Sequence, residues 1–491
     1  MNYQPRLEDI QFILEKVLHV PQRIAELPAY AEVDADLMNQ VLDEAGKFVA
    51  NEIAPLNRVG DEVGAQFNQG HVTMPPGFKE AYQSFWQSGW ASLTTATDDG
   101  GQALPAVLES VLYEWLSAAN HGWTMAPGLL HGAYECIKHH ASDELKAQYL
   151  SKVGTGEWLA TMCLTEPHAG SDLGLARTKA VPQADGSYQI SGTKIFISGG
   201  DHDLTDNIVH LVLARLPDAP AGPKGLSLFL VPKFYPDGSR SRVHCDRIEE
   251  KMGLYGSPTC VMRFDEAVCA IVGEPGKGLN AMFVMMNAAR LHVALQGIGL
   301  LDAAWQKADA YAQERRQMRA PGKGKSAGEA DLIGEHPAMR RILDTQRAWV
   351  DAGRVLAYRT ALELDLIKHS QDADTQAAAQ RWCALVTPVM KSVFTHQAFH
   401  GGSDCLQIFG GHGYVREWGI EQIVRDARVA MIYEGTNEIQ AIDLVTRKIL
   451  DDGGRRADAL RRLLADETTA CAGDARLQPH ARALDGQLQA W

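Results

Sequence analysis

The sequence predicts an α+β protein with an N-terminal all-α domain, a central small antiparallel β domain and a C-terminal four-helix bundle. Apolar residues recur at helical spacing before about residue 158 and after about residue 279, while short β-branched and aromatic runs fill the segment between them. No long helix separates those runs, which argues against a parallel βαβ sheet and favours a small antiparallel sheet or barrel. A length of 491 residues is also typical of about three domains.

The N-terminal part is expected to hold a helical extension over residues 1–36 and the all-α domain over residues 37–158. The extension carries acids early and has no signal-peptide core, so its apolar residues favour an amphipathic helix. Residues 36–59 predict a long helix that Pro55 ends. The apolar side chains of that helix stand at helical spacing: Leu37, Val41, Leu42, Ala45, Phe48 and Val49.

The middle β domain is expected over residues 159–278. Gly, Pro, Asp and Asn separate its β-branched and aromatic runs, which is typical of strands joined by turns. The strands are expected within residues 186–200, 207–216, 225–234 and 259–268.

The helical bundle is expected over residues 279–450, followed by a tail over residues 451–491. Four helical runs in a row suggest a bundle, and they cover residues 280–317, 336–367, 377–410 and 437–450. The Gly-, Lys- and acid-rich residues 319–335 predict an exposed loop. In the tail, residues 454–464 have apolar residues at helical spacing and predict a charged helix.

Composition excludes several classes of partner. A net charge of −14 argues against nucleic acid, although local cationic groups still allow an anionic small ligand. Eight scattered cysteines without a CxxC pair favour reduced thiols and a cytoplasmic location. The sequence contains no run of 18 or more apolar residues, so no membrane span is predicted. The acids of residues 201–206 are expected to be solvated rather than to bind a metal, and His131, His139 and His140 to be surface residues.

Four short segments carry candidate chemistry, and each has a plainer structural explanation. In "MIYEGTNEIQ", Glu434 is either a helix-start carboxylate or a base held in an apolar pocket. In "MCLTEPHAGSDLG", Thr165 can donate a hydroxyl and the turn at residues 170–172 can face an anion, unless this is a simple strand and turn. In "KIFISGG", Phe196 can stack on a flat ring and Ser198 can hydrogen-bond it, unless Phe196 is an ordinary core aromatic.

The fourth segment is "LQIFGGHGYVREWGIEQIVRDAR", residues 406–428. Its glycines can admit a phosphate, or they can simply stop a helix. No predicted strand precedes them, so they are not the dinucleotide-binding fingerprint.

Taken together and in this order, "CLTEPHAGSD", "KIFISGG", "QIFGGHGY" and "YEGTNEIQ" resemble the motifs of the acyl-CoA dehydrogenase family. The resemblance covers about residues 37–450. The N-terminal extension and the loop after Arg319 are similar to a long branch that includes 3-methylmercaptopropionyl-CoA dehydrogenases and broad-range fatty acyl-CoA dehydrogenases. Members of that branch usually carry a further C-terminal domain, so the tail is expected to be its truncated start.

The resemblance implies that Glu434 is the catalytic base. Family chemistry removes the α-proton of an acyl-CoA thioester and passes the β-hydrogen as hydride to N5 of FAD. Burial that raises the pKa of the base would assist the proton transfer. The amide of Glu434 and a ribityl hydroxyl of FAD would hold the thioester carbonyl as charge develops. Gly435 would allow close approach of the ligand, and Tyr433 would form a wall of the pocket. Some members place the base on another helix, but the matching position here is Ala289, which cannot ionise.

The resemblance also implies the binding residues. Arg315 and the backbone of residues 407–411 would reach the FAD pyrophosphate of a neighbouring subunit, so a homodimer or homotetramer is expected. The residues implied to bind FAD are Leu164, Thr165, Gly170, Ser171, Phe196, Ser198, Arg315, Gln407, Gly410, Gly411, Thr436 and Glu438. The residues implied to bind the acyl-CoA are Ser171, Asn287, Arg290, Tyr433 and Gly435. No metal is expected.

The expected activity is FAD-dependent α,β-dehydrogenation of an acyl-CoA to a trans-2-enoyl-CoA, with electrons passed to electron-transferring flavoprotein. An acyl-CoA oxidase of the same fold is an alternative, because the sequence does not select the electron acceptor. A helical scaffold that has lost its flavin is another. The length and branching of the acyl chain stay open.

Overall fold

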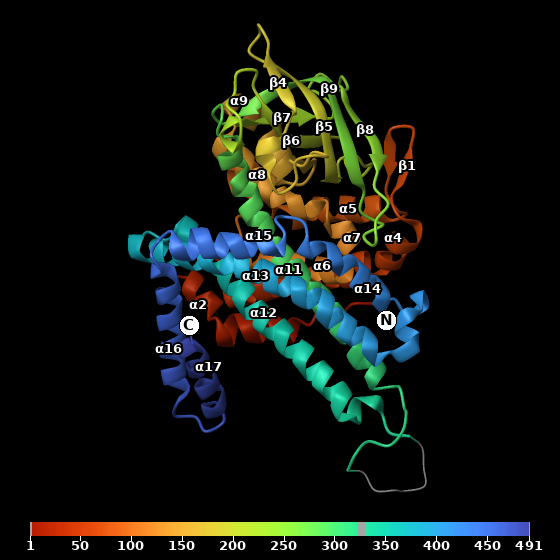
Figure 1. The fold of residues 1–491 in the computed structure, drawn as a ribbon, viewed down its shortest axis with the longest axis vertical. Helices are drawn as coiled ribbons and strands as arrows, with labels where there is room; N and C mark the ends of the chain where they lie inside the picture. Colours follow the sequence, from red (N-terminus) through yellow and green to blue (C-terminus); the bar gives the residue numbers. More distant parts are fainter. Residues whose placement is uncertain (1, 323–329, 491) are drawn as a thin grey trace.

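The computed structural model describes residues 2–322 and 330–490. A β domain lies at one end of the molecule, the long helices of the bundle lie beside it, and a pair of C-terminal helices packs at the edge (Figure 1). The largest hydrophobic core joins the N-terminal helical domain to the bundle, and a second core fills the β domain.

The N-terminal domain is helical, as predicted. Asp34 caps α3 (Ala35–Phe48) by accepting a hydrogen bond from the amide of Leu37, and a π-helical turn (Val49–Ile53) extends that helix to the 3-10 turn containing Pro55. Most of α6 is buried, because helices pack against it from several sides. The other helices of this domain are α4 (Asn57–Val63), α5 (Phe78–Gln87), α6 (Ala106–Ala119), α7 (His121–Thr124), α8 (Leu130–His140), α9 (Asp143–Leu145) and α10 (Ser151–Gly154). A two-stranded hairpin, β1 (Gln66–Asn68) and β2 (His71–Thr73), projects from it.

The N-terminal extension forms α1 (Leu7–Phe12) and α2 (Val20–Ile24) and is fastened to the bundle by buried polar contacts. Tyr3 donates a hydrogen bond to the carboxylate of Asp302 at 2.9 Å, and Tyr30 donates one to Asp365 at 2.6 Å. Because these bonds satisfy buried carboxylates, the extension is part of the folded unit rather than a loose arm.

The β domain is a closed, mostly antiparallel sheet. Around the barrel, β6 pairs with β4, β4 with β5, β5 with β9, β9 with β7 and β7 with β6 again. Strand β3 pairs in parallel with β6, and β4 touches β6 in parallel through one residue pair, so the antiparallel prediction misses these two contacts. The strands are β3 (Leu159–Cys163), β4 (Lys179–Pro182), β5 (Tyr188–Ser198), β6 (Ile208–Arg215), β7 (Leu226–Pro232), β8 (Val243–Ile248) and β9 (Thr259–Val272).

The bundle consists of three long helices and several short ones. Helix α11 is long and apolar enough to cross a membrane, but 78% of its most apolar window is buried in the protein, so packing accounts for its apolar side chains. Asp372 caps α13 by accepting from the amide of Thr375. The helices are α11 (Gly278–Ala312), α12 (Pro337–His369), α13 (Ala373–Ile408), α14 (Ile420–Ala427) and α15 (Asn437–Ile442), which a π-helical stretch (Asp443–Leu450) continues.

The loop and the tail differ in part from expectation. Residues 323–329 of the predicted loop lie outside the described residues, while Asp331 is buried and accepts a hydrogen bond from the amide of Ala320 at 2.7 Å. The tail forms the predicted helix as α16 (Arg455–Cys471) and a second helix, α17 (Gln478–Ala490), packs beside it.

Two polar assignments from the sequence are wrong. Asp201 is not solvated: it is buried, forms an ion pair with Lys233 at 2.6 Å and accepts a hydrogen bond from the amide of Val72. His131 is not a simple surface residue either, because it contacts the carboxylate of the buried Glu109 at 3.2 Å.

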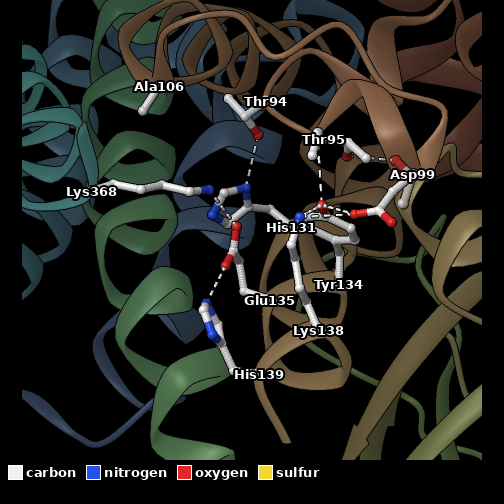
Figure 2. A network of polar contacts seen from close by, with 12 residues as sticks. Thr94, Thr95, Asp99, Ala106, His131, Tyr134, Glu135, Lys138, His139 and Lys368 are labelled. Atoms are coloured by element: carbon white, nitrogen blue, oxygen red, sulfur yellow. Dashed lines mark hydrogen bonds and ion pairs between the residues drawn. The ribbon is translucent and has the colours of Figure 1, made fainter. Parts of the chain in front are cut away.

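His131 belongs to a polar network that joins α8 to its neighbours (Figure 2). Its ring lies 3.0 Å from the hydroxyl of Thr94, while Glu135 on the same helix pairs with Lys368 of α12 and with His139. Burial alone would raise the pKa of Glu109, but the adjacent His131 lowers it to about 2. The contact therefore acts as an ion pair that ties the N-terminal domain together.

Candidate functional site

Glu434 lies in a tight loop between α14 and α15 whose backbone is held in an uncommon conformation. Its φ is +55° and that of Gly435 is +81°, so two consecutive residues are left-handed. This conformation is disfavoured for a residue with a Cβ and persists where the surroundings impose it. The side-chain amide of Gln440 donates to the carbonyl of Glu434 at 3.0 Å, and Nζ of Lys391 donates to the carbonyl of Gly435 at 2.7 Å.

The carboxylate of Glu434 is left available by the protein. Within the described residues it accepts no hydrogen bond, although the residue is half-buried. Burial raises its pKa to about 7, while the cationic Arg290 and Lys391 oppose that rise. A carboxyl group with this pKa exchanges a proton readily near neutral pH, as a general base must.

The backbone amide of Glu434 is also available. Neither it nor the amide of Gly435 donates to any acceptor in the described parts of the chain. In the trans peptide between Glu434 and Gly435, the amide of Gly435 points away from the carbonyl of Glu434, which Gln440 holds. Free amides beside a carboxylate suit an oxygen on which negative charge develops.

Tyr433 is fixed beside the base. Its hydroxyl donates to the side-chain carbonyl of Gln296 on α11 at 2.6 Å and lies 3.5 Å from Nε2 of His121. Burial raises the pKa of Tyr433 and lowers that of His121 to about 4, so both side chains are neutral at pH 7. Tyr433 is therefore a rigid neutral surface next to Glu434.

The structure brings Leu164, Thr165, Phe196 and Ser198 together in the β domain. The amide of Ile195 donates to the carbonyl of Thr165 at 2.9 Å. Lys194, which is fully buried, donates to the carbonyl of Leu164 at 3.0 Å and pairs with Glu166 at 2.8 Å. The segment after β3 is thus bound to the end of β5.

Phe196 has an exposed aromatic ring that could stack on a flat ligand. It sits at an irregularity in the β5–β9 pairing with a φ of +59°, and 61% of its surface is exposed. An exposed aromatic ring on a strained strand end is costly unless something stacks on it. The family resemblance implies that the isoalloxazine ring of FAD would stack here, with Ser198 and Thr165 at its edge.

The turn after Thr165 is open. Gly170 and Ser171 are exposed, and a Cβ on Gly170 would contact nothing within 4 Å. The carboxylate of Asp172 accepts from the amide of Gly174 at 3.0 Å and so shapes the turn.

Asn287 and Arg290, which are implied to bind CoA, lie on α11, whereas Thr436 and Glu438, which are implied to bind FAD, lie at the start of α15. Asn287 is exposed, while Arg290 is 8% exposed and contacts Asp443 at 3.7 Å. Thr436 caps α15 by accepting from the amide of Ile439 at 3.3 Å, a structural role that the sequence reasoning did not assign. Glu438 is exposed, and hydrogen bonds at the helix start lower its pKa, so it carries a charge at neutral pH.

Arg315, Gln407, Gly410 and Gly411 gather at the other end of the bundle. Tyr311, one helical turn before Arg315, stacks on Phe409 with ring centroids 4.3 Å apart. Gln407, Gly410 and Gly411 are exposed, and no atom lies within 4 Å of a Cβ built on either glycine.

Arg315 lies just past the C-terminal end of α11, opposite the end at which that helix leaves the β domain. Helix α11 starts directly after β9, and its 35 residues span about 52 Å to the end that carries Arg315 (Figure 1).

Some residues at the site were missed by the sequence reasoning: Lys391, Gln440, Gln296 and His121. Lys391 and Gln296 lie in predicted helical runs without a motif, His121 lies outside those runs, and Gln440 closes the "YEGTNEIQ" motif without having been singled out. A lysine within the apolar pattern of residues 385–394 is the one signal that the sequence offered.

Comparisons with known proteins agree with this geometry. The chain matches the acyl-CoA dehydrogenase N-terminal domain over residues 36–157, the middle domain over 161–267 and the C-terminal domain over 276–450. It is 44% identical over 470 residues to a 3-methylmercaptopropionyl-CoA dehydrogenase of Ruegeria pomeroyi, covering 95% of this chain and 79% of that protein. It is 35% identical over 473 residues to a broad-specificity linear acyl-CoA dehydrogenase of Mycobacterium tuberculosis, covering 92% and 76%.

The fold is also that of solved relatives. The butyryl-CoA dehydrogenase of Megasphaera elsdenii superposes with a TM-score of 0.69 at 24% identity, over 84% of this chain and 97% of that one. The chain belongs to the acyl-CoA dehydrogenase family, whose members are flavoproteins that dehydrogenate acyl-CoA thioesters.

Proposed function

We propose that this protein is an FAD-dependent acyl-CoA dehydrogenase in which Glu434 takes the α-proton of the substrate. The observation that carries the proposal is the state of Glu434: its carboxylate has no hydrogen-bond partner among the described residues, and burial raises its pKa to about 7. Its plainer role as a helix cap is not supported, because the side chain of Thr436 caps α15.

In the proposed reaction, the free amide of Glu434 donates to the thioester carbonyl and so favours loss of the α-proton. The carboxylate of Glu434 accepts that proton, and Tyr433 limits where the acyl chain can lie. FAD, when bound, supplies the acceptor for the β-hydrogen and its electron pair. Phe196 orients the flavin by stacking, with Thr165 and Ser198 at its edge.

The CoA moiety is proposed to extend from the base along α11. Asn287 is exposed there, and Arg290 adds a positive charge beside it. Gly435 leaves room for the thioester, and Thr436 and Glu438 border the adenine end of the cofactor. Glu438 is charged and would repel a phosphate, so we place it next to a ribose hydroxyl.

The assembly proposed is a homodimer or a homotetramer in the cytoplasm, with electron-transferring flavoprotein as the electron acceptor. The assembly is proposed because the family resemblance places Arg315 and residues 407–411 beside the FAD pyrophosphate of a neighbouring subunit.

The function is tested by adding a panel of acyl-CoA thioesters anaerobically and following the loss of flavin absorbance. The panel contains short, medium and long linear chains and 3-methylmercaptopropionyl-CoA. Bleaching by at least one thioester is expected. A protein that binds no FAD, or a flavin that no thioester bleaches, would contradict the proposal. Peroxide formation in air without transfer to electron-transferring flavoprotein would instead identify an oxidase.

A further inference from the structure

Lys391 is a buried lysine without an ion-pair partner. It lies on α13, its side chain is 0% exposed, and no carboxylate comes within 4.0 Å of its Nζ among the described residues. Lys194, which is also fully buried, contrasts with it, because Lys194 is paired with Glu166 at 2.8 Å. A buried cation that is not paired destabilises a fold, so a neutral side chain would serve better if Lys391 only filled space.

The contacts of Lys391 point to the loop of the proposed base. Its Nζ donates to the carbonyl of Gly435 at 2.7 Å and to the side-chain oxygen of Asn437 at 3.1 Å. Asn437 has another anchor, since its side-chain Nδ2 donates to the carbonyl of Ser392 at 3.1 Å. The bond to Gly435 is therefore the contact for which Lys391 is needed.

That bond fixes the peptide plane that follows Gly435. Gln440 fixes the preceding plane through the carbonyl of Glu434 at 3.0 Å, but its side chain lies 3.5 Å from the carbonyl of Gly435 and holds it weakly. These two planes flank the Cα of Gly435, so holding both fixes its left-handed φ of +81°. The plane between Glu434 and Gly435 also restricts the backbone of Glu434, whose φ of +55° is strained for a non-glycine residue.

Charge adds to this geometry. Burial lowers the pKa of Lys391 to about 8, while Glu434 opposes that change, so the lysine is still mostly charged at pH 7. The two cations that act on Glu434 are Lys391 and Arg290. Arg290 also contacts Asp443 at 3.7 Å, and the negative charge of Asp443 partly offsets the positive potential of Arg290 at Glu434.

We propose that Lys391 is a positioning residue for Glu434: it holds the loop in its left-handed conformation through the Gly435 carbonyl and places a positive charge beside the carboxylate. Only the effect of Lys391 on catalysis rests on the proposed function of Glu434. The structural part can be measured without substrate.

The test compares Lys391→Met, which removes both donor and charge, with Lys391→Gln, which keeps an amide donor and removes the charge. Lys251→Met is the matched control, because Lys251 is a half-buried lysine that donates to the backbone carbonyl of Ser257 at 3.0 Å. All variants are studied as the full chain with FAD, and flavin content is measured first.

The first measurement is hydrogen–deuterium exchange over residues 432–442, where the amides of Tyr433, Ile439 and Gln440 are hydrogen-bonded. Exchange is expected to be at least tenfold faster in Lys391→Met and close to wild type in Lys391→Gln. The control is expected to leave exchange in this segment unchanged. Wild-type exchange in a folded Lys391→Met protein would overturn the positioning role.

The second measurement is the pH dependence of anaerobic flavin reduction by the best acyl-CoA. Lys391→Met is expected to reduce its flavin at least tenfold more slowly, and in both Lys391 variants the midpoint of the profile is expected to move to higher pH. A merely structural role would leave that midpoint in place. Should Lys391→Met fail to fold, Lys391→Gln decides: a raised midpoint supports the proposal, and an unchanged one overturns it. A wild-type flavin that no acyl-CoA bleaches overturns the proposed function instead, while the exchange experiment still decides the role of Lys391.

Discussion

Replacing Glu434 by Gln is expected to slow catalysis by about 10²- to 10⁴-fold and, at alkaline pH, to stabilise the protein. Burial raises the pKa of Glu434 from its usual 4.5 to about 7. Each tenfold change in proton affinity corresponds to about 1.36 kcal/mol, so the folded state holds the ionised carboxylate about 3 kcal/mol less favourably than the unfolded chain does.

The sign follows from the raised pKa. Above pH 7 the carboxylate is charged in both states and the full penalty opposes folding, whereas below pH 4.5 it is protonated in both and the penalty vanishes. Glu434→Gln cannot ionise, so its free energy of unfolding at pH 8 is expected to exceed that of the wild type by up to about 3 kcal/mol. For a chain of 491 residues this corresponds to a rise in Tm of about 3 °C.

The assay is thermal unfolding of the FAD-loaded wild type, Glu434→Gln and the exposed control Glu144→Gln, from pH 8 to pH 5. The Tm difference between Glu434→Gln and wild type is expected to shrink as the pH falls, and the control is expected to show none. In the same samples, anaerobic flavin bleaching by acyl-CoA is expected to be about 10²- to 10⁴-fold slower in Glu434→Gln. A Gln variant that is less stable at pH 8, or that bleaches at the wild-type rate, would refute the reasoning.

Three further changes test other parts of the structure. Arg315→Ala is expected to weaken FAD retention while leaving the Tm of the apoprotein unchanged, because its side chain is exposed. A wild-type protein that is a monomer by light scattering and still binds FAD fully by absorbance would count against the shared site. Arg354 contacts the buried carboxylates of Glu114 and Asp302, both at 2.7 Å, and Arg354→Met leaves them without a cation. The free energy of unfolding by denaturant is expected to fall by about 3 to 5 kcal/mol, and a loss below about 1 kcal/mol would argue against that network. Deleting residues 466–491 is expected to leave flavin reduction intact, since these residues are mostly exposed, and loss of FAD on deletion would tie the tail to the working core.

The sequence was sufficient for most elements because their patterns are local. Helix α11 was expected over residues 280–317 and spans Gly278–Ala312, and strand β5 was expected within residues 186–200 and spans Tyr188–Ser198. Apolar periodicity and turn residues carry this information within a few residues of each position. The short strands β4 and β8 were not predicted, because Pro182 in β4 and the charged residues of β8 are not typical of a strand.

The candidate site divides in the same way. Phe196, Thr165 and Glu434 could be singled out because each lies in a short motif whose residue types suit flavin or thioester chemistry. Their surroundings could not be read in advance, and His131 and Asp201 illustrate why: both looked like solvated polar residues, and both are engaged with partners far away in the chain.

By itself, the sequence determined the order of helical and β segments, the location of the motifs and hence the family. Only the tertiary structure decided how Glu434 behaves as an acid. Its raised pKa comes from burial, against the opposing effect of the cations Arg290 and Lys391 on other helices. Its left-handed loop is held through Gly435 by Lys391, 44 residues away in sequence. Local motifs specify residue types, but the field and the hydrogen bonds around a side chain depend on distances that exist only once the helices have packed.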